Sequence, residues 1–413
     1  MTVVVVGAGH GGVQAAASLR DLGYTDKIVL VDGQPHLPYQ RPPLSKAFLG
    51  DSGGRGGEGE PLRAREFFDS HRVELELAAE VTGLRTADHH VRLADGRTLA
   101  YDHLVLATGA TNRALEVPGT ELDGVVELRT LADASALRGR LRTARNIVVI
   151  GGGFIGLEVA AVAAASSSVT VVEPQERVMA RAVAPFVSDA VQRAHARAGV
   201  NVIVRTGAVA FAGDEGQVRR VRLTDGVELP ADLVVVAVGV TANDRLALEA
   251  GMHVDNGIVV DPWLRTSAAD VFAIGDCAAR VHEGSPTPRR LECVQNAVDQ
   301  ARHVATSIVH GRGEPYERVP YFWTHQLDLR IQTVGLGSAD DEHVVLGERD
   351  RDRFSVCRFR NDRLVAVESV NRPRDHMAAR RILDEGGDLR VCDAKRDGFD
   401  LKEYAHAELG NKV

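Results

Sequence analysis

The sequence contains the glycine pattern G-x-G-x-x-G twice: at Gly7, Gly9 and Gly12, and again at Gly151, Gly153 and Gly156. Each pattern follows a short apolar run, residues 3–6 or 147–150, which is typical of a buried parallel strand. Helix-forming residues come next, at 13–22 and 157–165, and then a second apolar strand, at 28–31 and 169–172. Two strand–turn–helix–strand units are therefore predicted, and they restrict the chain to an α/β fold with two dinucleotide-binding sheets.

Acidic residues end the second strand of both units. In this arrangement the glycines allow a tight turn, close approach of a pyrophosphate, and packing of the helix on the strand, while the helix N-terminus attracts the phosphates. Asp32 lies where a carboxylate accepts from a ribose hydroxyl. Glu173 would pair with the ribose hydroxyls of NAD and repel the 2′-phosphate of NADP, so NADH is the expected substrate. Arg177 and Arg181 could instead neutralise that phosphate, and this alternative stays open.

Two dinucleotide sites in one chain indicate that one nucleotide is a tightly bound cofactor and the other is a co-substrate that binds and dissociates. Hydride transfer between them requires a flavin ring beside a nicotinamide ring, so we predict tightly bound FAD with NADH as co-substrate. The four cysteines form no closely spaced pair, which argues against a disulphide reductase. Cysteine and histidine do not cluster at metal-ligand spacing, so no metal site is predicted.

A second duplication supports the domain organisation. Residues 91–110 and 221–240 are identical at ten of twenty positions, and each contains an Asp-Gly hairpin signal, then an apolar strand and a glycine, Gly109 or Gly239. Residues 266–278 predict a strand ending at Gly275-Asp276 just before a helix, where Asp276 could accept from hydroxyls of the flavin's ribityl chain. The chain is thus expected to return to its first domain after completing the second.

We therefore predict two Rossmann-like domains of the glutathione-reductase type, the second inserted in the first, and a C-terminal α+β domain. The expected boundaries are 1–110 and 245–320 for the FAD-binding domain, 111–244 for the NAD-binding domain and 321–413 for the last domain. Alternating runs at 329–334, 344–346, 354–359 and 364–367 predict an antiparallel sheet there, followed by helices near 375–383 and 401–409. The glycine-rich stretch 50–59 has no preceding strand and is expected to be a mobile surface loop.

Composition limits the remaining classes of function. The net charge of −8 provides no global positive field for nucleic acid. No apolar run approaches the roughly 20 residues that a membrane helix needs. Met1 runs straight into the first strand without a basic leader, so a cytoplasmic protein is expected.

Two adjacent prolines occur in the segment Arg41-Pro42-Pro43-Leu44-Ser45-Lys46. They stiffen the backbone and could hold Arg41 and Lys46 against a cofactor. The alternative is a surface loop whose charges are solvated. With this segment, the sequence resembles the putidaredoxin reductase family, the FAD-dependent ferredoxin reductases of bacterial haem monooxygenase and ring-hydroxylating dioxygenase systems. The matching strings run from residue 3 to about residue 382: VVVVGAGHGGVQAA, RPPLSKAFL, YDHLVLATGA, LRTLADA, VVIGGGFIGLEVAA, DNGIVVD, AIGDCA, PYFWTHQ and VNRPRDHMAARRI.

The resemblance implies roles for individual residues. Lys46 would lie near flavin N5 and pair with Glu158, where a lysine stabilises negative charge and a carboxylate holds the lysine. Ile155 and Glu158 would face the nicotinamide, and Trp323 would lie beside both rings. Further residues fall where the family contacts FAD or close by: Gly11, Asp32, Arg41, Val81, Thr108, Arg129, Asp276, Glu292 and Val294.

One departure from the family lies beside Trp323. The family usually has Ser-Asp after the Phe-Trp pair, whereas this chain has Thr324-His325. A charge is lost near the flavin, which would affect its redox potential or the choice of partner.

The electron acceptor is expected to be a separate protein, because the chain has no cysteine set for an iron–sulfur cluster. A ferredoxin of this class carries a 2Fe–2S centre and is normally acidic. It could dock on a local basic patch, with the enzyme acting as a monomer. The candidate arginines are Arg289, Arg290, Arg330, Arg372, Arg374, Arg380 and Arg381.

Three other functions remain open. A rubredoxin reductase would have the same architecture. An NADH oxidase or peroxidase would need a reactive cysteine near the flavin, where this chain has Ser45-Lys46. A slow NADH-sensing flavoprotein like apoptosis-inducing factor would be indicated by long insertions or a basic leader, and neither is present in the sequence.

Overall fold

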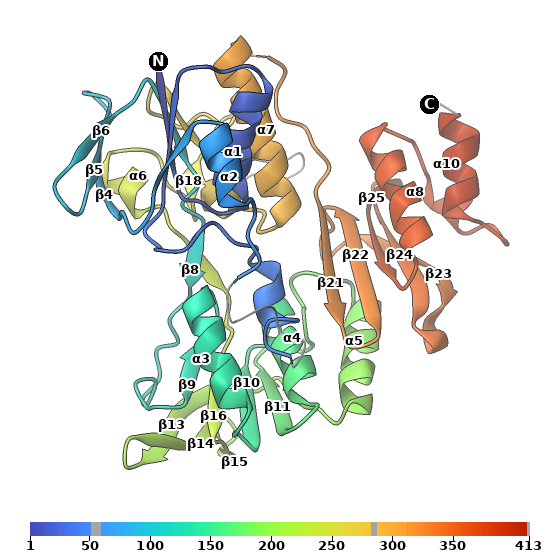
Figure 1. Cartoon of the computed structure of the whole chain (residues 1–413). Helices are drawn as coiled ribbons and strands as arrows, with labels where there is room; N and C mark the ends of the chain where they lie inside the picture. The colour runs from blue at the N-terminus through green and yellow to red at the C-terminus, as the bar shows by residue number, and fades with distance from the viewer. Residues whose placement is uncertain (51–58, 282–286, 312, 411–413) are drawn as a thin grey trace. The chain divides into compact units, whose positions relative to one another are not determined.

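The computed structural model describes residues 1–50, 59–281, 287–311 and 313–410 (Figure 1). The chain divides into two compact units. Unit 1 comprises Met1–Arg41, Gly59–Thr111 and Val240–Arg318, and unit 2 comprises Pro42–Glu58, Asn112–Gly239 and Val319–Val413. The second unit interrupts the first in sequence, so the chain does return to its first fold. Most of the predicted glycine-rich loop, residues 51–58, lies outside the described residues.

Unit 1 is built on a parallel sheet with the order β19-β7-β1-β2-β3. Its strands are β1 (Thr2–Val6), β2 (Lys27–Val31), β3 (Val73–Glu76), β7 (His103–Leu106) and β19 (Val271–Ala273). The interior of the sheet is apolar because both faces are covered, and the side chains of Val3, Val4 and Val5 have no exposed surface. Helix α1 (His10–Asp21) packs against α7 (Val294–His310), as Figure 1 shows.

Unit 2 repeats this plan in a second parallel sheet with the order β12-β11-β10-β16-β9. The strands are β9 (Val125–Glu127), β10 (Asn146–Ile150), β11 (Ser168–Glu173), β12 (Asn201–Val204) and β16 (Leu233–Val236). The associated helices are α3 (Leu131–Leu141), α4 (Phe154–Ala163) and α5 (Pro185–Arg197). Both predicted βαβ units are therefore confirmed, and so is the Rossmann-like fold class.

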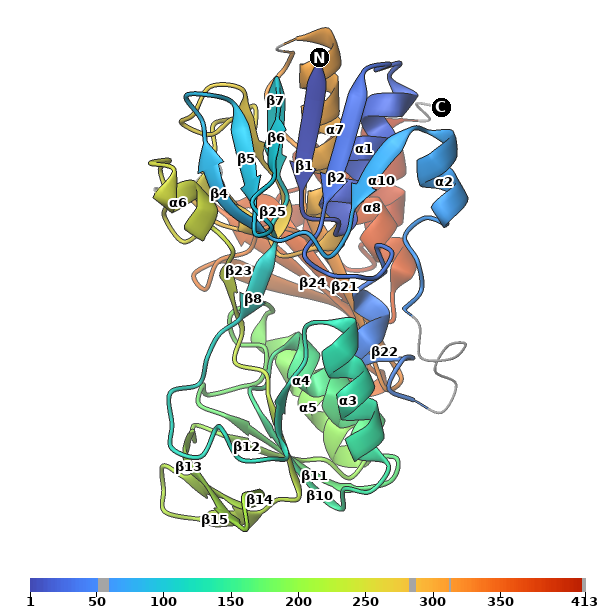
Figure 2. The same cartoon turned by 60° about the vertical axis from the view of Figure 1, so that its left-hand side comes forward.

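The duplicated Asp-Gly signals form hairpins in both units. In unit 1 the three-stranded sheet is β4 (Val81–Arg85), β5 (His90–Leu93) and β6 (Thr98–Ala100). In unit 2 it is β13 (Ala208–Asp214), β14 (Gln217–Leu223) and β15 (Glu228–Pro230), labelled in Figure 2. Each hairpin leads into the strand that pairs with the fingerprint strand, β7 or β16, as the repeat predicts.

The C-terminal part of unit 2 is an antiparallel sheet with the order β21-β22-β25-β24-β23. Its strands are β21 (Tyr321–Gln326), β22 (Leu329–Gly335), β23 (Glu342–Glu348), β24 (Arg353–Arg360) and β25 (Arg363–Val370). Helices α8 (Pro373–Asp384) and α10 (Leu401–Leu409) lie side by side, and α8 packs on the sheet. The short helix α9 (Val391–Ala394) lies between them in sequence. The predicted α+β pattern is confirmed, although β21 was not among the predicted strands.

Helix α5 is bonded at both ends to this C-terminal sheet. At its N-terminus the backbone N–H of Ala184 donates to Glu368 on β25 at 2.7 Å. Toward its C-terminus, Arg193 and Arg197 each form an ion pair of 2.8 Å with Asp352, the residue before β24. An acid at the start of a helix and bases at its end both complement the helix dipole. Helix α5 thus links the dinucleotide fold of unit 2 to the C-terminal sheet at both of its ends.

The prediction of a helix directly after Asp276 is wrong. The segment Gly275–Cys277 is a single 3₁₀ turn (η3), and the next residues form β20 (Ala278–Ala279), which pairs with β18 (Ile258–Val259). Both alanines are buried, so a strand that fills a gap in the core is favoured over an exposed helix start. The expected helix is α7, which begins at Val294 and reaches the turn through Gln300, whose Oε1 accepts from Gly275 N at 2.7 Å.

Candidate dinucleotide sites and the Lys46–Glu158 cluster

The first glycine fingerprint leaves open space at the N-terminus of α1. Gly7 has φ +104°, and a Cβ there would lie 2.3 Å from the carbonyl oxygen of Ala107. A Cβ on Gly12 would lie 1.8 Å from the oxygen of Gly7, so side chains are excluded at both positions. A Cβ on Gly9 would meet nothing within 4 Å. The turn is closed on its protein side and open at the helix N-terminus, which fits a pyrophosphate group.

Asp32 braces this turn from the end of β2. Its Oδ2 accepts from Ala8 N at 2.7 Å and its Oδ1 accepts from Gln34 N at 2.8 Å. Each carboxylate oxygen keeps a second lone pair, so the group can also accept from ribose hydroxyls. The predicted position of an acid beside the first nucleotide fingerprint therefore has the geometry that the role requires.

The other predicted residues of unit 1 lie on several elements around this sheet. Thr108 follows β7, and its hydroxyl donates to Asn243 O at 2.6 Å. Asp276 lies in η3, where its backbone oxygen accepts from Arg290 at 2.9 Å. Unit 1 as a whole holds Gly7, Gly9, Gly11, Gly12, Asp32, Arg41, Val81, Thr108, Asp276, Glu292 and Val294.

His10 is a neighbour of this site that the motif analysis did not single out. It is the first residue of α1, inside the fingerprint. Its pKa is lowered to about 4, mainly by burial; Arg41 contributes to the shift and Asp276 opposes it. A neutral imidazole therefore faces the two charged groups.

The second fingerprint reproduces the first in unit 2. Gly151 has φ +108°, and a Cβ there would lie 2.3 Å from the oxygen of Ala237; a Cβ on Gly153 would meet nothing within 4 Å. A Cβ on Gly156 would lie 2.1 Å from the oxygen of Gly151. Glu173 accepts from Gly152 N at 2.7 Å and from Gln175 N at 2.8 Å. This site fits a second dinucleotide for the same physical reasons.

The guanidinium of Arg177 is hydrogen-bonded to neighbouring residues of the protein. It donates to Val183 O at 2.8 Å, to Ala180 O at 2.8 Å and to Ser188 Oγ at 2.6 Å. Burial lowers its pKa. These bonds hold the loop between β11 and α5, and they leave little of the guanidinium to meet a phosphate. Arg181 is exposed and lies beside Gly239, where a Cβ would be 3.8 Å from its side chain.

Glu158 on α4 is the centre of a buried polar cluster in unit 2. Its side chain is 2% exposed, and its Oε2 forms an ion pair of 2.7 Å with the Nζ of Lys46. The same oxygen accepts from the hydroxyl of Ser45, while Oε1 accepts from Thr324 Oγ1 at 2.6 Å. Lys46 also donates to Pro42 O at 3.1 Å. Such a charge needs several donors, because an unpaired buried carboxylate is strongly destabilising.

The two apolar side chains that were predicted to lie beside the nicotinamide are partly exposed. Trp323 is 39% exposed and Ile155, on α4, is 44% exposed. Strand β21 turns Trp323 and His325 to one face and the buried Thr324 and Gln326 to the other. Burial lowers the pKa of His325, and Arg330 and Lys46 lower it further. In place of the family's acid, this chain therefore has a neutral imidazole.

Unit 2 holds the remaining predicted residues: Lys46, Arg129, Gly151, Gly153, Ile155, Gly156, Glu158, Glu173, Gly239 and Trp323. Motif analysis missed Ser45, Gln326 and His195 as members of the Glu158 cluster. Ser45 could have been found from its place beside Lys46. Gln326 could have been found from strand alternation with Thr324, while nothing local in the sequence indicates His195.

The arginines predicted to bind the ferredoxin differ in their exposure and in the ion pairs they form. Arg290 has a side chain only 6% exposed and pairs with Glu292 at 2.8 Å, so its inclusion in a docking patch is wrong. Arg372 and Arg381 are paired with Asp375 and Glu385. Arg380 stacks over Tyr321, with 4.0 Å between its Cζ and the ring centre. Arg289, Arg330 and Arg374 are exposed and form no ion pair with another described residue.

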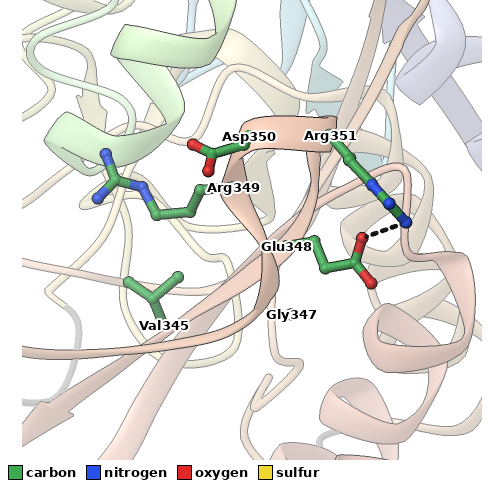
Figure 3. Close-up of a pocket in the computed structure, with 6 residues that line it drawn as sticks. All are labelled: Val345, Gly347, Glu348, Arg349, Asp350 and Arg351. Carbon is green, nitrogen blue, oxygen red and sulfur yellow. Dashed lines mark ion pairs between the residues drawn. The ribbon is translucent and has the colours of Figure 1, made fainter.

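A hollow of about 640 Å³ lies on the C-terminal sheet, away from both fingerprints in sequence (Figure 3). It is lined by Val345, Gly347, Glu348, Arg349, Asp350 and Arg351. Glu348 and Arg351 pair with each other at 3.0 Å, and Arg349 stacks on Phe186. Because Glu348 and Arg351 already pair with each other there, we assign it no ligand.

The described residues contain neither a cluster of metal-binding side chains nor a membrane-spanning helix. Residues 1–50, 59–281, 287–311 and 313–410 contain no group of three or more acidic, histidine or cysteine side chains that could hold a metal ion. Within those ranges no helix has the length and apolar character to cross a bilayer. All four cysteines carry free thiols.

Comparison with known proteins agrees with this geometry. Residues 1–301 match the family described as pyridine nucleotide-disulphide oxidoreductase, and residues 321–405 match the one described as reductase C-terminal. The chain is 43% identical to rhodocoxin reductase of Rhodococcus erythropolis, covering 100% of this chain and 99% of that protein. It is 37% identical to a rubredoxin-NAD(+) reductase of Pseudomonas putida, covering 95% and 100%.

Among solved structures, the covalent putidaredoxin reductase–putidaredoxin complex superposes with a TM-score of 0.94 at 36% identity, over 99% of both chains. The match thus extends through both dinucleotide folds and the C-terminal sheet. The chain belongs to the pyridine nucleotide-disulphide oxidoreductase family, among the putidaredoxin reductase-like members that end in a reductase C-terminal domain.

Proposed function

We propose that this protein is an NADH:ferredoxin reductase, which transfers a hydride from NADH to FAD and then passes single electrons to a 2Fe–2S ferredoxin. The observation that carries the proposal is the ion pair between Lys46 and the buried Glu158, which lies two residues after the second fingerprint. A lysine held by a carboxylate supplies fixed positive charge where a hydride acceptor develops negative charge. In this proposal the FAD-binding domain is 1–110 with 245–320, the NAD-binding domain is 111–244 and the C-terminal domain is 321–413.

The residues of this chain would divide the work between the two sites. Gly7, Gly9 and Gly12 with Asp32 would hold FAD, and Gly151, Gly153 and Gly156 with Glu173 would hold NADH. Bound FAD would accept two electrons from the donor and release them one at a time. Arg41, Val81, Thr108, Arg129, Asp276, Glu292 and Val294 are proposed to complete the FAD site.

Lys46, Glu158 and Trp323 would act where the two rings meet. Glu158 fixes the Lys46 ammonium at 2.7 Å, and its bonds to Ser45 and Thr324 keep the carboxylate from rotating. Trp323 and Ile155 are partly exposed and would offer apolar surface to a nicotinamide.

NADH is the proposed substrate because of Glu173 and Arg177. A carboxylate at the end of β11 accepts from ribose hydroxyls and repels a phosphate. The three hydrogen bonds from Arg177 to its own loop support this choice, because they occupy the arginine that follows the acid. Arg181 is then the remaining candidate for contact with a 2′-phosphate.

We further propose that an acidic ferredoxin docks on the C-terminal part of unit 2, and that the enzyme is a cytoplasmic monomer. Arg330 and Arg374 are exposed there, and Met377, between Arg374 and Arg380 on α8, is 60% exposed. Unpaired cations around an exposed apolar side chain suit a transient acidic partner, which needs fast association more than high affinity. Arg289, in unit 1, is exposed as well.

A rubredoxin is the second candidate acceptor, because a relative with 37% identity over 95% of this chain bears the name of a rubredoxin reductase. Both acceptors are small iron proteins, so the dinucleotide sites do not distinguish them. The Phe-Trp-Thr-His sequence on β21 and the arginines of α8 would take part in the choice.

The test is anaerobic stopped-flow absorbance of the flavin after mixing with NADH and, separately, with NADPH. A 2Fe–2S ferredoxin or a rubredoxin is then added together with cytochrome c. Fast bleaching by NADH, with relay to cytochrome c only when the ferredoxin is present, is the expected result. Relay through rubredoxin alone would transfer the proposal to that acceptor. Slow bleaching with a long-lived charge-transfer band and no relay would indicate an NADH-sensing flavoprotein instead.

A further inference from the structure

The Glu158 cluster continues into the protein as a row of fully buried polar side chains. Thr324 Oγ1 lies 3.4 Å from Gln326 Nε2, and Gln326 Oε1 lies 3.2 Å from His195 Nε2. Thr324 and His195 have no exposed surface, Gln326 is 1% exposed and Glu158 is 3% exposed. Four buried polar groups in contact are costly unless each satisfies the next.

The direction of every hydrogen bond in this row follows from the carboxylate. A carboxylate only accepts, so the Thr324 hydroxyl gives its proton to Glu158 at 2.6 Å. Thr324 must therefore accept from the amide nitrogen of Gln326, which turns the amide oxygen toward His195. The imidazole must then donate from Nε2. All three protons point toward Glu158, and bonds aligned in this way polarise one another.

The state of His195 agrees with that assignment. Its Nδ1 has no hydrogen-bond partner among the described residues, so the single N–H of a neutral ring lies on Nε2. Burial lowers the pKa of this histidine, and the bond to Gln326 only partly opposes the shift. The neutral form that the row requires is therefore the form that the site favours.

We propose that Gln326 and His195 are positioning residues, which hold the Thr324 hydroxyl on Glu158 and thereby fix the Lys46 ammonium. The inference rests on the proposed function and deepens it. Neither residue touches the Lys46–Glu158 pair directly. Helix α5 supplies His195, so the NAD-side helix and strand β21 of the C-terminal sheet together set the position of one lysine.

The experiment measures how readily the amine of Lys46 is acetylated in the purified flavoprotein. Trace acetylation followed by mass spectrometry gives the labelling of Lys46 relative to Lys27 and Lys395. These two lysines form surface ion pairs of 2.8 and 2.6 Å and serve as internal references. The variants are Gln326→Met, His195→Leu and His195→Gln. Ser355→Ala is the control, because this fully buried hydroxyl on β24 bonds to Asp375 and lies outside the row.

Gln326→Met and His195→Leu are expected to raise the relative labelling of Lys46 about fivefold. Both should also slow the limiting rate of flavin bleaching about tenfold, which is the scale of one lost buried hydrogen bond. The NADH concentration for half-maximal rate stays unchanged. His195→Gln restores both values, because its amide also donates. Ser355→Ala lowers thermal stability without affecting either value.

Unchanged Lys46 labelling in Gln326→Met, or equal effects of His195→Leu and His195→Gln, would overturn the inference. Failure of the proposed function would look different. The flavin of the unaltered protein would then resist NADH, while the labelling experiment would still report whether the row holds Lys46.

Discussion

Asp32 and Glu173 receive the same pair of backbone hydrogen bonds in two different sheets. Each carboxylate accepts from the residue after the first fingerprint glycine, at 2.7 Å, and from the residue two positions beyond itself, at 2.8 Å. The difference of one methylene between aspartate and glutamate is thus accommodated without changing the contact to the turn. Each acid therefore braces its own turn, and under the proposed function it would also present its outer lone pairs to a ribose.

Replacing Glu173 by alanine is expected to raise the NADH concentration for half-maximal flavin reduction by at least about tenfold, since hydrogen bonds to a charged group contribute about 1.5–3 kcal/mol. The response to NADPH should improve relative to NADH, because the repulsion of the 2′-phosphate is removed. Initial rates with both nucleotides provide the measurement. Glu176→Ala removes an exposed neighbouring acid and should leave the ratio unchanged. A parallel loss with both nucleotides would refute the proposed role in discrimination.

Arg177→Met is expected to affect stability and not nucleotide choice. The substitution removes the donors to Val183 O, Ala180 O and Ser188 Oγ, so the free energy of unfolding should fall by about 1–3 kcal/mol. Denaturant unfolding and the ratio of NADH to NADPH rates are the two readouts. Arg181→Met, at an exposed position, should leave stability unchanged. A selective loss of NADPH activity in Arg177→Met would show that this arginine does meet the phosphate.

Lys46→Met is expected to lower the limiting rate of flavin reduction by NADH about 100-fold, the scale of removing one preorganised charge from a reacting centre. It also leaves Glu158 buried without its counter-ion, so thermal stability should fall as well. Lys27 forms an ion pair of nearly the same length with Glu74, but on the surface, where such pairs contribute little. Lys27→Met is thus the matched control, and equal rates in the two variants would remove Lys46 from the mechanism.

The acid stability of the protein should depend on His376. Burial is the main cause that lowers its pKa to about 4, and Arg380 and Arg330 contribute to this shift. Between the ordinary pKa near 6.5 and about 4, the unfolded chain binds a proton that the folded chain excludes, so stability falls as the pH falls through this window.

His376→Gln should remove this part of the acid dependence, which amounts to at most about 3 kcal/mol near pH 4. Urea unfolding at pH 7, 6, 5 and 4.5 measures the slope. The exposed His36 provides the control substitution, His36→Gln. An acid slope that persists in His376→Gln would assign the effect to other groups.

Arg374→Glu is expected to slow electron transfer to an acidic ferredoxin about tenfold at low salt, with the difference shrinking as ionic strength rises. Reduction of ferricyanide by NADH should not change, because that reaction needs no docked protein. Arg220→Glu, on the exposed hairpin strand β14, makes the same charge change elsewhere in unit 2. Equal slowing in both variants would indicate a general effect of net charge and not a docking site.

Local signals made most of the fold predictable. The glycine fingerprints, the terminal acids and the Asp-Gly hairpins each lie within a short stretch of chain, and each produces one backbone geometry wherever it occurs. The C-terminal strands were predictable because apolar residues alternate along them. Strand β21 was missed because its pattern is inverted: the buried positions are Thr324 and Gln326, and the exposed one is Trp323.

The polar clusters depend on contacts distant in sequence. Thr324 is 166 positions from Glu158, and Gln326 is 131 positions from His195. The resemblance to a family predicted the Lys46–Glu158 pair, but nothing in the sequence distinguishes His195 from a histidine on the surface of its helix. Arg177 was similarly ambiguous, because only the folded loop shows which acceptors surround it.

The attachment of α5 at both ends also matters for how such reductases can be recombined. The partners of Ala184, Arg193 and Arg197 in the C-terminal part of the chain lie beyond residue 320, although the helix itself belongs to the inserted fold. A chimaera that exchanges only the sequence after residue 320 would separate Glu368 and Asp352 from the helix they hold. A grafted C-terminal domain should therefore be transferred together with its own α5. The unit that can be exchanged consists of two segments that are separate in the gene.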